Sequence, residues 1–261
     1  MQEASVYISL GLRRYVADAF ITVRRYTMNI IESIKNLTLF ERVLWLLSVT
    51  GIAGAFILVG DGDKMTLVAS LVGVTALIFV AKGDVLGQIL TVAFSVLYAI
   101  ISYNFRYFGE MITYVGMTAP IAVMSVVTWL RNPYSDREVK VNHLKPRTWG
   151  ILLPVTGVVT WVFYYILRAF DTPNLGFSTL SIATSFLASS LTMLRSPYYA
   201  VAYAANDIVL IVLWVLATME DIKYFPMILC FSIFFVNDIY GFINWRKMSH
   251  KQQKESIAMV D

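Results

Sequence analysis

The chain is short of the residues that build disulfides and metal centres. Its 261 residues include one cysteine, Cys230, and two histidines, His143 and His250, with no further Cys or His at ligand spacing. A disulfide framework and a thiol-ligated metal site are therefore excluded, and we expect both histidines to be solvated loop residues. The sequence also has no G-x-x-x-x-G-K-[ST] segment, which excludes a P-loop ATPase. We expect no metal and no cofactor.

Charged residues are scarce as well. Asp, Glu, Lys and Arg make up 15% of the chain and hydrophobic residues 58%, with a mean hydropathy of +0.66. This balance excludes an ordinary soluble domain and predicts an all-α integral membrane protein, because apolar windows of about 20 residues can cross a bilayer as helices. The sequence contains eight such windows, at about 42–60, 65–82, 86–104, 107–130, 149–169, 175–194, 198–218 and 222–245.

The basic residues divide unequally between the two sides of these predicted spans. Of the 21 Lys and Arg residues, 17 fall on one side, and the other side receives only Lys64, Arg106, Arg168 and Lys223. Basic residues favour the cytoplasmic side of a membrane. The charge bias therefore supports eight crossings and predicts that both termini are cytoplasmic.

The chain divides into three regions by composition. Residues 1–39 carry pairs of Arg among spaced apolar residues, which is typical of an amphipathic helix on the cytoplasmic surface, with a disordered arm as the alternative. Residues 40–248 form the predicted transmembrane domain, and residues 249–261 form a cytoplasmic tail. No extramembrane segment is large enough for a separate enzyme domain, so any work is done within the membrane.

The two halves of the transmembrane domain, about 40–130 and 148–246, resemble each other. The stretch "SVTGIAGAFIL" in the first span matches "PVTGVVTWVFYYIL" in the fifth, and "TWLRNP" after the fourth matches "INWRKM" after the eighth. Lys82 and Arg195 take corresponding places after the second and sixth spans. Four crossings return the chain to the same side, so the repeats are predicted to be parallel. Chance similarity between apolar segments is the alternative.

Polar side chains within the spans are the candidates for a binding site, because in a bilayer each must find a partner or a wet cavity. Asp207 lies near the middle of the seventh span, Asp238 in the central to inner part of the eighth, and Glu110 near the outer end of the fourth. The alternative is that such groups only hydrogen-bond across helix interfaces, which we expect for the Ser and Thr residues of the sixth span. The predicted substrate-binding residues are Gln88, Glu110, Tyr114, Asn206, Asp207, Trp214, Asn237, Asp238, Tyr240, Asn244 and Trp245.

Several segments in order resemble one family. The closing "NDIYGFINW" with its basic tail, the "YFGEM" opening of the fourth span and the "GDVLGQIL" start of the third are similar to the PnuC family of bacterial nicotinamide riboside transporters, over about residues 40–248. The resemblance implies a fold similar to SWEET sugar transporters: a 3+1+3 core of two parallel three-helix bundles joined by a linker helix. The fifth span would be the linker, and the first would be an additional N-terminal helix.

The resemblance also implies an activity. It is facilitated diffusion of nicotinamide riboside across the bacterial inner membrane, with a cytoplasmic kinase making uptake one-way, and with no enzymatic activity in this chain. Without an ATPase motif or an ion-relay chain, we expect uniport. A carrier of thiamine or riboflavin, an intramembrane enzyme using Asp207 and Asp238, and a structural membrane protein stay open as alternatives. A homo-oligomer is also left open, and we expect no nucleic-acid partner.

Overall fold

The computed structural model describes residues 30–59, 64–104 and 108–258. The chain divides into two compact units, Met1–Leu37 and Thr38–Asp261. In the first unit, the described residues contain the short helix α2 (Ile30–Lys35). The amphipathic helix predicted for residues 1–39 therefore falls almost wholly outside the described residues, as does Arg106 of the charge pattern.

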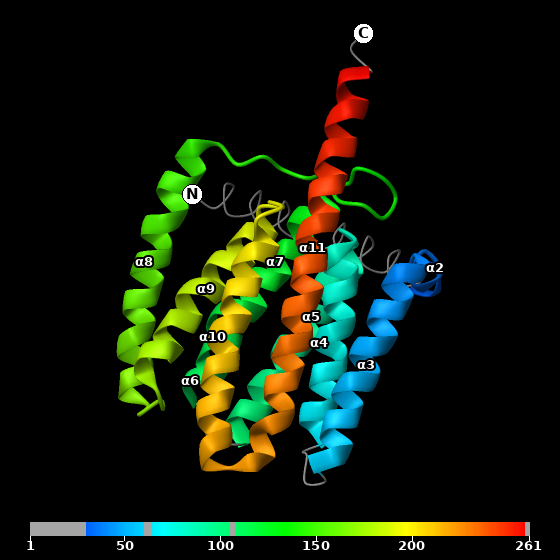
Figure 1. Ribbon diagram of the computed structural model, residues 1–261. Helices are drawn as coiled ribbons and strands as arrows, with labels where there is room; N and C mark the ends of the chain where they lie inside the picture. Colours follow the sequence, from blue (N-terminus) through cyan, green and yellow to red (C-terminus); the bar gives the residue numbers. More distant parts are fainter. Residues whose placement is uncertain (1–29, 60–63, 105–107, 259–261) are drawn as a thin grey trace, which may run out of the picture. The chain divides into compact units, whose positions relative to one another are not determined.

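The second unit is a set of long helices that run side by side (Figure 1). Eight helical stretches among the described residues are long and apolar enough to cross a membrane, which confirms the predicted all-α, multi-pass membrane protein. In chain order the elements are α3 (Leu39–Val59), α4 (Lys64–Ala81), α5 (Val85–Asn104), α6 (Phe108–Thr113), the π-helix η1 (Tyr114–Thr118), α7 (Ala119–Leu130), α8 (Pro146–Ala169), α9 (Leu175–Met193), α10 (Tyr199–Glu220), the 3-10 helix η2 (Ile222–Tyr224) and α11 (Phe225–Ala258).

Local sequence explains where several of these helices begin and how closely they approach. Thr38 and Glu41 form a capping box at the start of α3, in which each side chain accepts a hydrogen bond from the other residue's backbone N–H. Pro146 opens α8, where a missing N–H costs nothing. On α5, a Cβ at Gly87 would lie 2.4 Å from the backbone nitrogen of Val80, so only glycine permits the close contact between α4 and α5.

The helices form two groups of three. The second helix contacts both others in each group, α5 between α4 and α7, and α10 between α9 and α11. The groups meet where α4 packs on α11 and α7 packs on α9, so the first helix of each meets the last helix of the other. Such a reciprocal contact is what a two-fold axis generates. The arrangement is consistent with the expected 3+1+3 core, with α8 packed on α9 as the linker.

Helix α3 stands outside this scheme, as expected for an additional N-terminal helix. It packs on α4 and α11. The Trp45 indole donates to Thr75 Oγ1 of α4 at 3.0 Å, and Ser48 Oγ accepts from Asn237 Nδ2 of α11 at 3.1 Å. Helix α3 is therefore attached through side-chain hydrogen bonds as well as apolar packing.

Matching hydrogen bonds show the internal repeat in the structure. Trp129 Nε1 on α7 donates to the carbonyl of Thr192 at 2.9 Å, and Trp245 Nε1 on α11 donates to the carbonyl of Val80, also at 2.9 Å. Each bond joins the last helix of one group to the first helix of the other. The predicted similarity of "TWLRNP" and "INWRKM" therefore corresponds to one structural role, performed twice.

The neighbouring residues repeat the same pattern. Thr128 Oγ1 donates to the carbonyl of Met193 at 3.0 Å, and Asn244 Nδ2 donates to the carbonyl of Ala81 at 2.8 Å. Thr128 and Asn244 each come directly before a tryptophan. Met193 and Ala81 each come directly after the residue whose carbonyl accepts the tryptophan bond. The equivalence between the halves is thus defined residue by residue at this end of the bundle.

The turns that follow α4 and α9 correct one detail of the predicted repeat. Each turn contains a residue with left-handed backbone, Gly83 with φ 71° and Arg195 with φ 59°. Arg195 was expected to correspond to Lys82, but the turn hydrogen bonds place it opposite Gly83: the N–H of Gly83 donates to Val80, and the N–H of Arg195 donates to Thr192. The sequence comparison was wrong by one residue because it matched the basic side chains, whereas the backbone turn determines the register.

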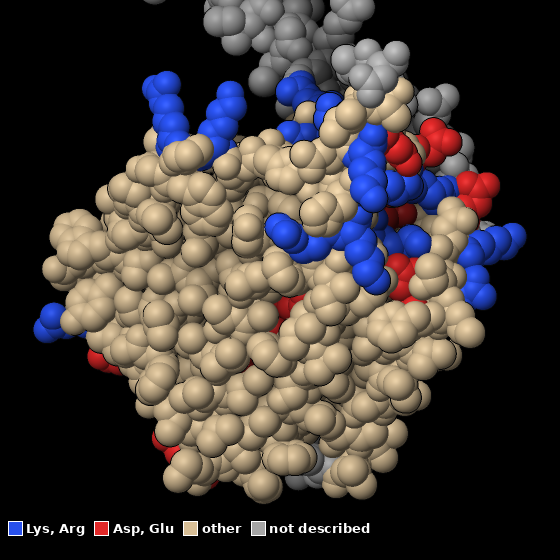
Figure 2. All heavy atoms as spheres, turned by 45° about the horizontal axis from the view of Figure 1, so that its top comes forward, with Lys and Arg blue, Asp and Glu red and all other residues tan. Residues whose placement is uncertain are grey.

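Basic side chains gather at one end of the second unit (Figure 2). This is the end that contains the loop between α7 and α8 and the C-terminal part of α11; we call it the basic end. Helix α11 continues there through residue 258, so most of the predicted tail, 249–261, is helical. The opposite end has only three described basic residues, Lys64, Arg168 and Lys223.

Candidate functional site

A cavity of about 370 Å³ lies at the opposite end of the bundle. Its walls come mainly from α5, α10, η2 and α11, with further residues from α3, α4 and the α8–α9 connection. Four aromatic residues, Phe56, Tyr98, Trp214 and Tyr224, and two acids, Glu220 and Asp221, are among the lining residues. The lining also includes Lys223, whose Nζ lies 2.6 Å from Oδ2 of Asp221. The volume lies in the range of small-molecule sites.

The aromatic side chains of the cavity are held in position by other rings. The Trp214 indole stacks on Phe231 with an interplanar angle of 13°, and its ring centroid lies 5.8 Å from that of Tyr224. The ring of Tyr98 lies 4.4 Å from that of Tyr114, one of the predicted site residues. Fixed aromatic faces of this kind can stack on a flat ligand and attract a cation.

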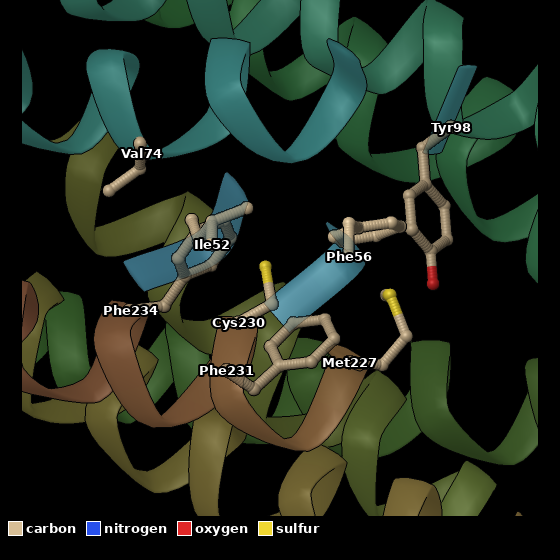
Figure 3. Packing of buried hydrophobic residues seen from close by; sticks show 8 residues of the cluster. All are labelled: Ile52, Phe56, Val74, Tyr98, Met227, Cys230, Phe231 and Phe234. Atoms are coloured by element: carbon tan, nitrogen blue, oxygen red, sulfur yellow. The ribbon is translucent and has the colours of Figure 1, made fainter. Parts of the chain in front are cut away.

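An apolar cluster forms the floor of the cavity. Figure 3 shows the eight buried side chains of this cluster packed against one another between α3, α4, α5 and α11. Phe56, Tyr98 and Met227 also line the cavity, so the cluster continues directly from its walls. On α11, Met227, Phe231 and Phe234 follow one another at spacings of four and three, which places them on one face. On α11 the cluster therefore lies between the cavity residue Met227 and the residues deeper along the helix.

Two acids lie beyond this floor. Asp207 precedes the cavity residue Leu210 by one turn on the same face of α10, and Asp238 follows Phe234 by one turn on α11. The two residues are 4% and 3% exposed, and their helices, α10 and α11, pack against each other. We call the two residues the acid pair. Oδ2 of Asp207 is buried without a hydrogen-bond partner among the described residues.

Three amides lie on the same helices or on α5. Asn206 Oδ1 accepts from Thr184 Oγ1 at 2.8 Å. Asn237, 1% exposed, donates to Ser48 and to the carbonyl of Ile233, and within the described part of the chain its Oδ1 has no partner. Gln88, 2% exposed, makes no side-chain hydrogen bond with any described residue. Amides with unused donors and acceptors can bind the hydroxyl and carboxamide groups of a ligand.

Buried polar atoms without partners are informative because each costs about 1–3 kcal/mol. Among the described residues, three completely buried side-chain atoms have no partner: Oδ2 of Asp207, Oδ1 of Asn237 and Nε of Arg195. The first two belong to the candidate site, and the third lies in the turn after α9. Burial lowers the pKa of the Arg195 guanidinium. The two oxygens beyond the cavity floor can accept hydrogen bonds or face a cation, which identifies this region as the candidate site.

The remaining predicted site residues have other partners in this structure. Tyr240 donates to Oε1 of Glu41 at 2.8 Å, which links α11 to the start of α3. Asn244 and Trp245 donate to backbone carbonyls of α4, as described above. Glu110 falls in α6, and its side chain is outside the described part of the structure. The structure thus brings some predicted residues together and commits others to helix packing.

Of the predicted site residues, Trp214 lines the cavity, but sequence reasoning did not find the other wall residues. Tyr98 and Ser102 line the cavity from α5, and Gln88 lies on the same stripe of that helix, since positions 88, 95, 98 and 102 recur at helical spacing. The stripe is visible in the sequence but was not used, because Ser and Tyr are common at helix interfaces. The acids at the end of α10 and in the following turn, Glu220 and Asp221, were not singled out from the sequence.

A bundle of eight potential spans with a cavity and polar groups beneath its floor has the features of a small-molecule membrane transporter. The sequence model of the nicotinamide mononucleotide transporter family matches residues 63–247, and the chain belongs to that family. It is therefore a transporter and not an enzyme. The match begins after α3, which agrees with the peripheral place of this helix.

Individual relatives carry the same type of name. The nicotinamide riboside transporter PnuC of Neisseria mucosa is 26% identical over 217 residues, which are 81% of this chain and 82% of that protein. PnuC of Haemophilus influenzae is 23% identical over 187 residues, which are 70% and 80% of the two proteins. A crystal structure of the vitamin B3 transporter PnuC matches the fold with a TM-score of 0.72, at 24% identity, and covers 83% of this chain and 94% of that chain.

Proposed function

We propose that this chain carries nicotinamide riboside across the bacterial inner membrane by facilitated diffusion. The basic end would face the cytoplasm, because basic residues are retained on that side of a membrane. Both termini would then be cytoplasmic, and the cavity would face outward. A separate cytoplasmic kinase would phosphorylate the nucleoside and make uptake one-way.

The observation that carries the proposal is the aromatic cavity with the acid pair beneath its floor. Nicotinamide riboside contains a flat pyridinium cation, a carboxamide and a ribose. The cation suits aromatic faces and carboxylates, and the other two groups suit amides. We propose that the principal contacts are made by Gln88, Asn206, Asp207, Trp214, Asn237 and Asp238. For Glu110 and Tyr114 a binding role stays a prediction, whereas Tyr240, Asn244 and Trp245 would serve helix packing.

The charges around the site favour the riboside over the mononucleotide. A phosphate group that leaves water needs a cationic partner. The lining contains one described basic residue, Lys223, and Asp221 already pairs with it, while Glu220 adds a further negative charge. The family is named for the mononucleotide, whereas the relatives from Neisseria mucosa and Haemophilus influenzae are named for the riboside. The charge distribution supports the second of these substrates.

Calorimetric titration of the purified protein tests the substrate. Nicotinamide riboside should bind, and the mononucleotide should bind at least about tenfold more weakly, which corresponds to about 1.4 kcal/mol. Thiamine and riboflavin serve as comparison ligands, because they represent the other vitamins considered. Equal affinities for the riboside and the mononucleotide would contradict the site, and preferential binding of thiamine or riboflavin would contradict the substrate.

Transport into proteoliposomes tests the mechanism. With no membrane potential, labelled nicotinamide riboside should reach the same final concentration inside and outside, with or without a proton or sodium gradient. No kinase is added, so the label stays free to leave. Accumulation above equilibrium under either gradient would rule out uniport.

A further inference from the structure

From the contacts at the basic end we infer that the loop between α7 and α8 is a latch. It holds the inner end of the transport path closed, and it must release α11 before the substrate can leave. We call residues 132–143 of this loop the strap. The inference rests on the proposed function for the substrate and for the orientation of the basic end, and it adds a moving part that the proposed function does not identify.

The strap lies where the two three-helix groups meet. Figure 1 shows the loop crossing the basic end and passing α11 on its way to α8. The groups meet along two seams, α4 against α11 and α7 against α9. Hydrogen bonds from Thr128, Trp129, Asn244 and Trp245 close both seams near this end. A path between the groups therefore reaches the basic end only when a seam separates there.

The backbone of the strap is hydrogen-bonded to the turns of both groups. The N–H of Val139 donates to the carbonyl of Gly83 at 3.0 Å, in the turn after α4. Three residues later, Asn142 reaches the turn after α9: its N–H donates to the carbonyl of Arg195 at 2.9 Å, and its Nδ2 donates to that of Leu194 at 3.1 Å. The groups cannot move apart at this end while all these bonds hold.

Gln252 of α11 forms the central attachment between this helix and the strap. Its Oε1 accepts a hydrogen bond from the N–H of Val141 at 2.8 Å. Its Nε2 donates to the carbonyl of Val139 at 3.0 Å and to Oε1 of Glu138 at 2.8 Å. Gln252 is 8% exposed. Its amide therefore directs its acceptor and both donors to the strap, which joins α11 of the second group to the turn after α4 of the first.

Two further contacts extend this attachment along α11. Oγ of Ser249 lies 3.1 Å from Nε2 of His143, and the hydroxyl of Tyr134 donates to the carboxylate of Glu255. Ser249, Gln252 and Glu255 follow one another at spacings of three, which places them on one face of the helix. The strap thus contacts α11 along a single face.

The chemistry of the attachment suits repeated opening and closing. The contacts on α11 are hydrogen bonds of side chains at the end of the bundle, where water can replace a lost partner, so release leaves no polar group unsatisfied. Val139 and Val141 of the strap are buried, at 2% and 8% exposed. Returning these two apolar side chains to their places favours closure again.

Helix α11 connects the strap to the cavity at the other end of the bundle. It is one continuous helix, Phe225–Ala258, in which Met227 lines the cavity. Gln252 lies about 38 Å further along, at about 1.5 Å per residue. A rigid helix that tilts about its middle moves its two ends in opposite directions. Movement of α11 toward the cavity would therefore draw Gln252 away from the strap, so closure at one end and release at the other are one motion.

A reversible cross-link tests whether the strap must release α11. Tyr134→Cys and Glu255→Cys are combined with Cys230→Ala and joined in detergent by a short bis-methanethiosulfonate reagent, which leaves Gln252 and its partners unchanged. After reconstitution, we expect the linked protein to transport labelled nicotinamide riboside at less than about a tenth of the rate before linking. A thiol reductant should restore the rate. An equal rate in the linked protein would overturn the inference.

A cross-link within α11 is the matched control. Lys247→Cys and Lys251→Cys, again with Cys230→Ala, stand four residues apart on the exposed surface of the same helix. The same reagent should join them without loss of transport, because this link does not tie the two groups together. In the protein linked between strap and α11, calorimetry should show an affinity for nicotinamide riboside within about twofold of the unlinked value, since the cavity at the opposite end stays accessible.

Gln252→Leu tests the central attachment. The change removes three hydrogen bonds that hold the strap closed, so the released state should be more populated and the initial rate of transport should rise about threefold to tenfold. Gln253→Leu, at the exposed neighbouring position, is the control and should keep the parent rate. A loss of stability alone would lower the rate. If Gln252→Leu folds but transports no faster than the parent, the latch is overturned; if it does not fold, the cross-link decides.

The unlinked protein tests the proposed function in the same experiment. If it transports nicotinamide riboside and the cross-link has no effect, the latch is wrong and the proposed substrate stands. Conversely, if it transports only thiamine or riboflavin and the cross-link stops that transport, the substrate is wrong and the latch stands. If it transports none of the three, both are wrong.

Discussion

The two three-helix groups share one scaffold and differ in the buried side chains halfway along their helices. At the basic end, Trp129 and Trp245 perform the same role, each donating to a carbonyl of the other group. The hydrogen bonds of the two turns fix the register of the next helices, with Gly87 of α5 equivalent to Tyr199 of α10. Counted from these positions, Ser95 of α5 stands where α10 has Asp207.

The other acid shows the same difference. Counted back from Trp129 and Trp245, Ala122 of α7 stands where α11 has Asp238. All four side chains are buried. In the first group the two positions hold Ser95, whose hydroxyl donates to the carbonyl of Thr91, and Ala122, whose side chain is a methyl group. The fold therefore does not need the acids. We therefore expect the features that both groups share to serve the architecture, and we propose that the acid pair, present in one group, serves function.

The largest expected effect comes from breaking the shared scaffold. Trp129→Ala and Trp245→Ala each remove a fully buried indole and its hydrogen bond, and each should lower the free energy of unfolding by about 3–5 kcal/mol. Trp161→Ala on α8 is the control, because that side chain is 62% exposed and is expected to face lipid. Thermal unfolding in detergent measures all three. A Trp245→Ala protein of normal stability and reduced substrate affinity would instead place Trp245 in the binding site.

The second prediction makes the second group resemble the first. The double variant Asp207→Ser, Asp238→Ala installs the residues found at the equivalent positions, and we expect it to fold with stability equal to or above that of the parent. Affinity for nicotinamide riboside should fall about a hundredfold, or about 3 kcal/mol, because the carboxylates for the cation are gone. Thermal unfolding and calorimetry on the same preparation test both parts. Loss of folding would show that the acids serve the architecture.

The sequence predicted the architecture well because hydropathy, charge and repeated segments report on it directly. Eight apolar windows and the similarity of "TWLRNP" to "INWRKM" are local properties, and both correspond to structure. The unused amide of Gln88 and the satisfied amide of Asn244 could not be distinguished, because the partner of Asn244 lies 163 residues away at Ala81. The burial of Asp207 and Asp238 likewise depends on how two helices rotate against each other.

The third prediction tests this distinction between amides. Gln88→Leu removes an amide with no described partner, so stability should stay the same or rise, while substrate affinity falls about fivefold to thirtyfold, or about 1–2 kcal/mol. Asn244→Leu is the matched change at an amide that is hydrogen-bonded to α4. It should lower the free energy of unfolding by about 1–2 kcal/mol and leave affinity unchanged. If both variants lose stability equally, the absence of a partner at Gln88 has no functional meaning.

The smallest expected effect concerns the rim of the cavity, where Lys223 pairs with the exposed Asp221. Hydrogen bonds from Lys223 hold the pKa of Asp221 below its usual range, so the contact is present at neutral pH and is lost only as the pH falls through that lowered value. An exposed pair contributes little to stability, so Lys223→Gln should leave the unfolding temperature unchanged.

The same substitution removes the described positive charge from the cavity lining and leaves Glu220 and Asp221. Association of a cationic ligand should therefore become faster, by about twofold at low salt, and the difference should disappear above about 0.5 M salt, where charges are screened over a few ångströms. Stopped-flow measurement of nicotinamide riboside binding at two salt concentrations tests this, with its reduced, uncharged dihydropyridine form as the control. Slower association in Lys223→Gln would mean that Lys223 orders the turn around the cavity and that its charge is secondary.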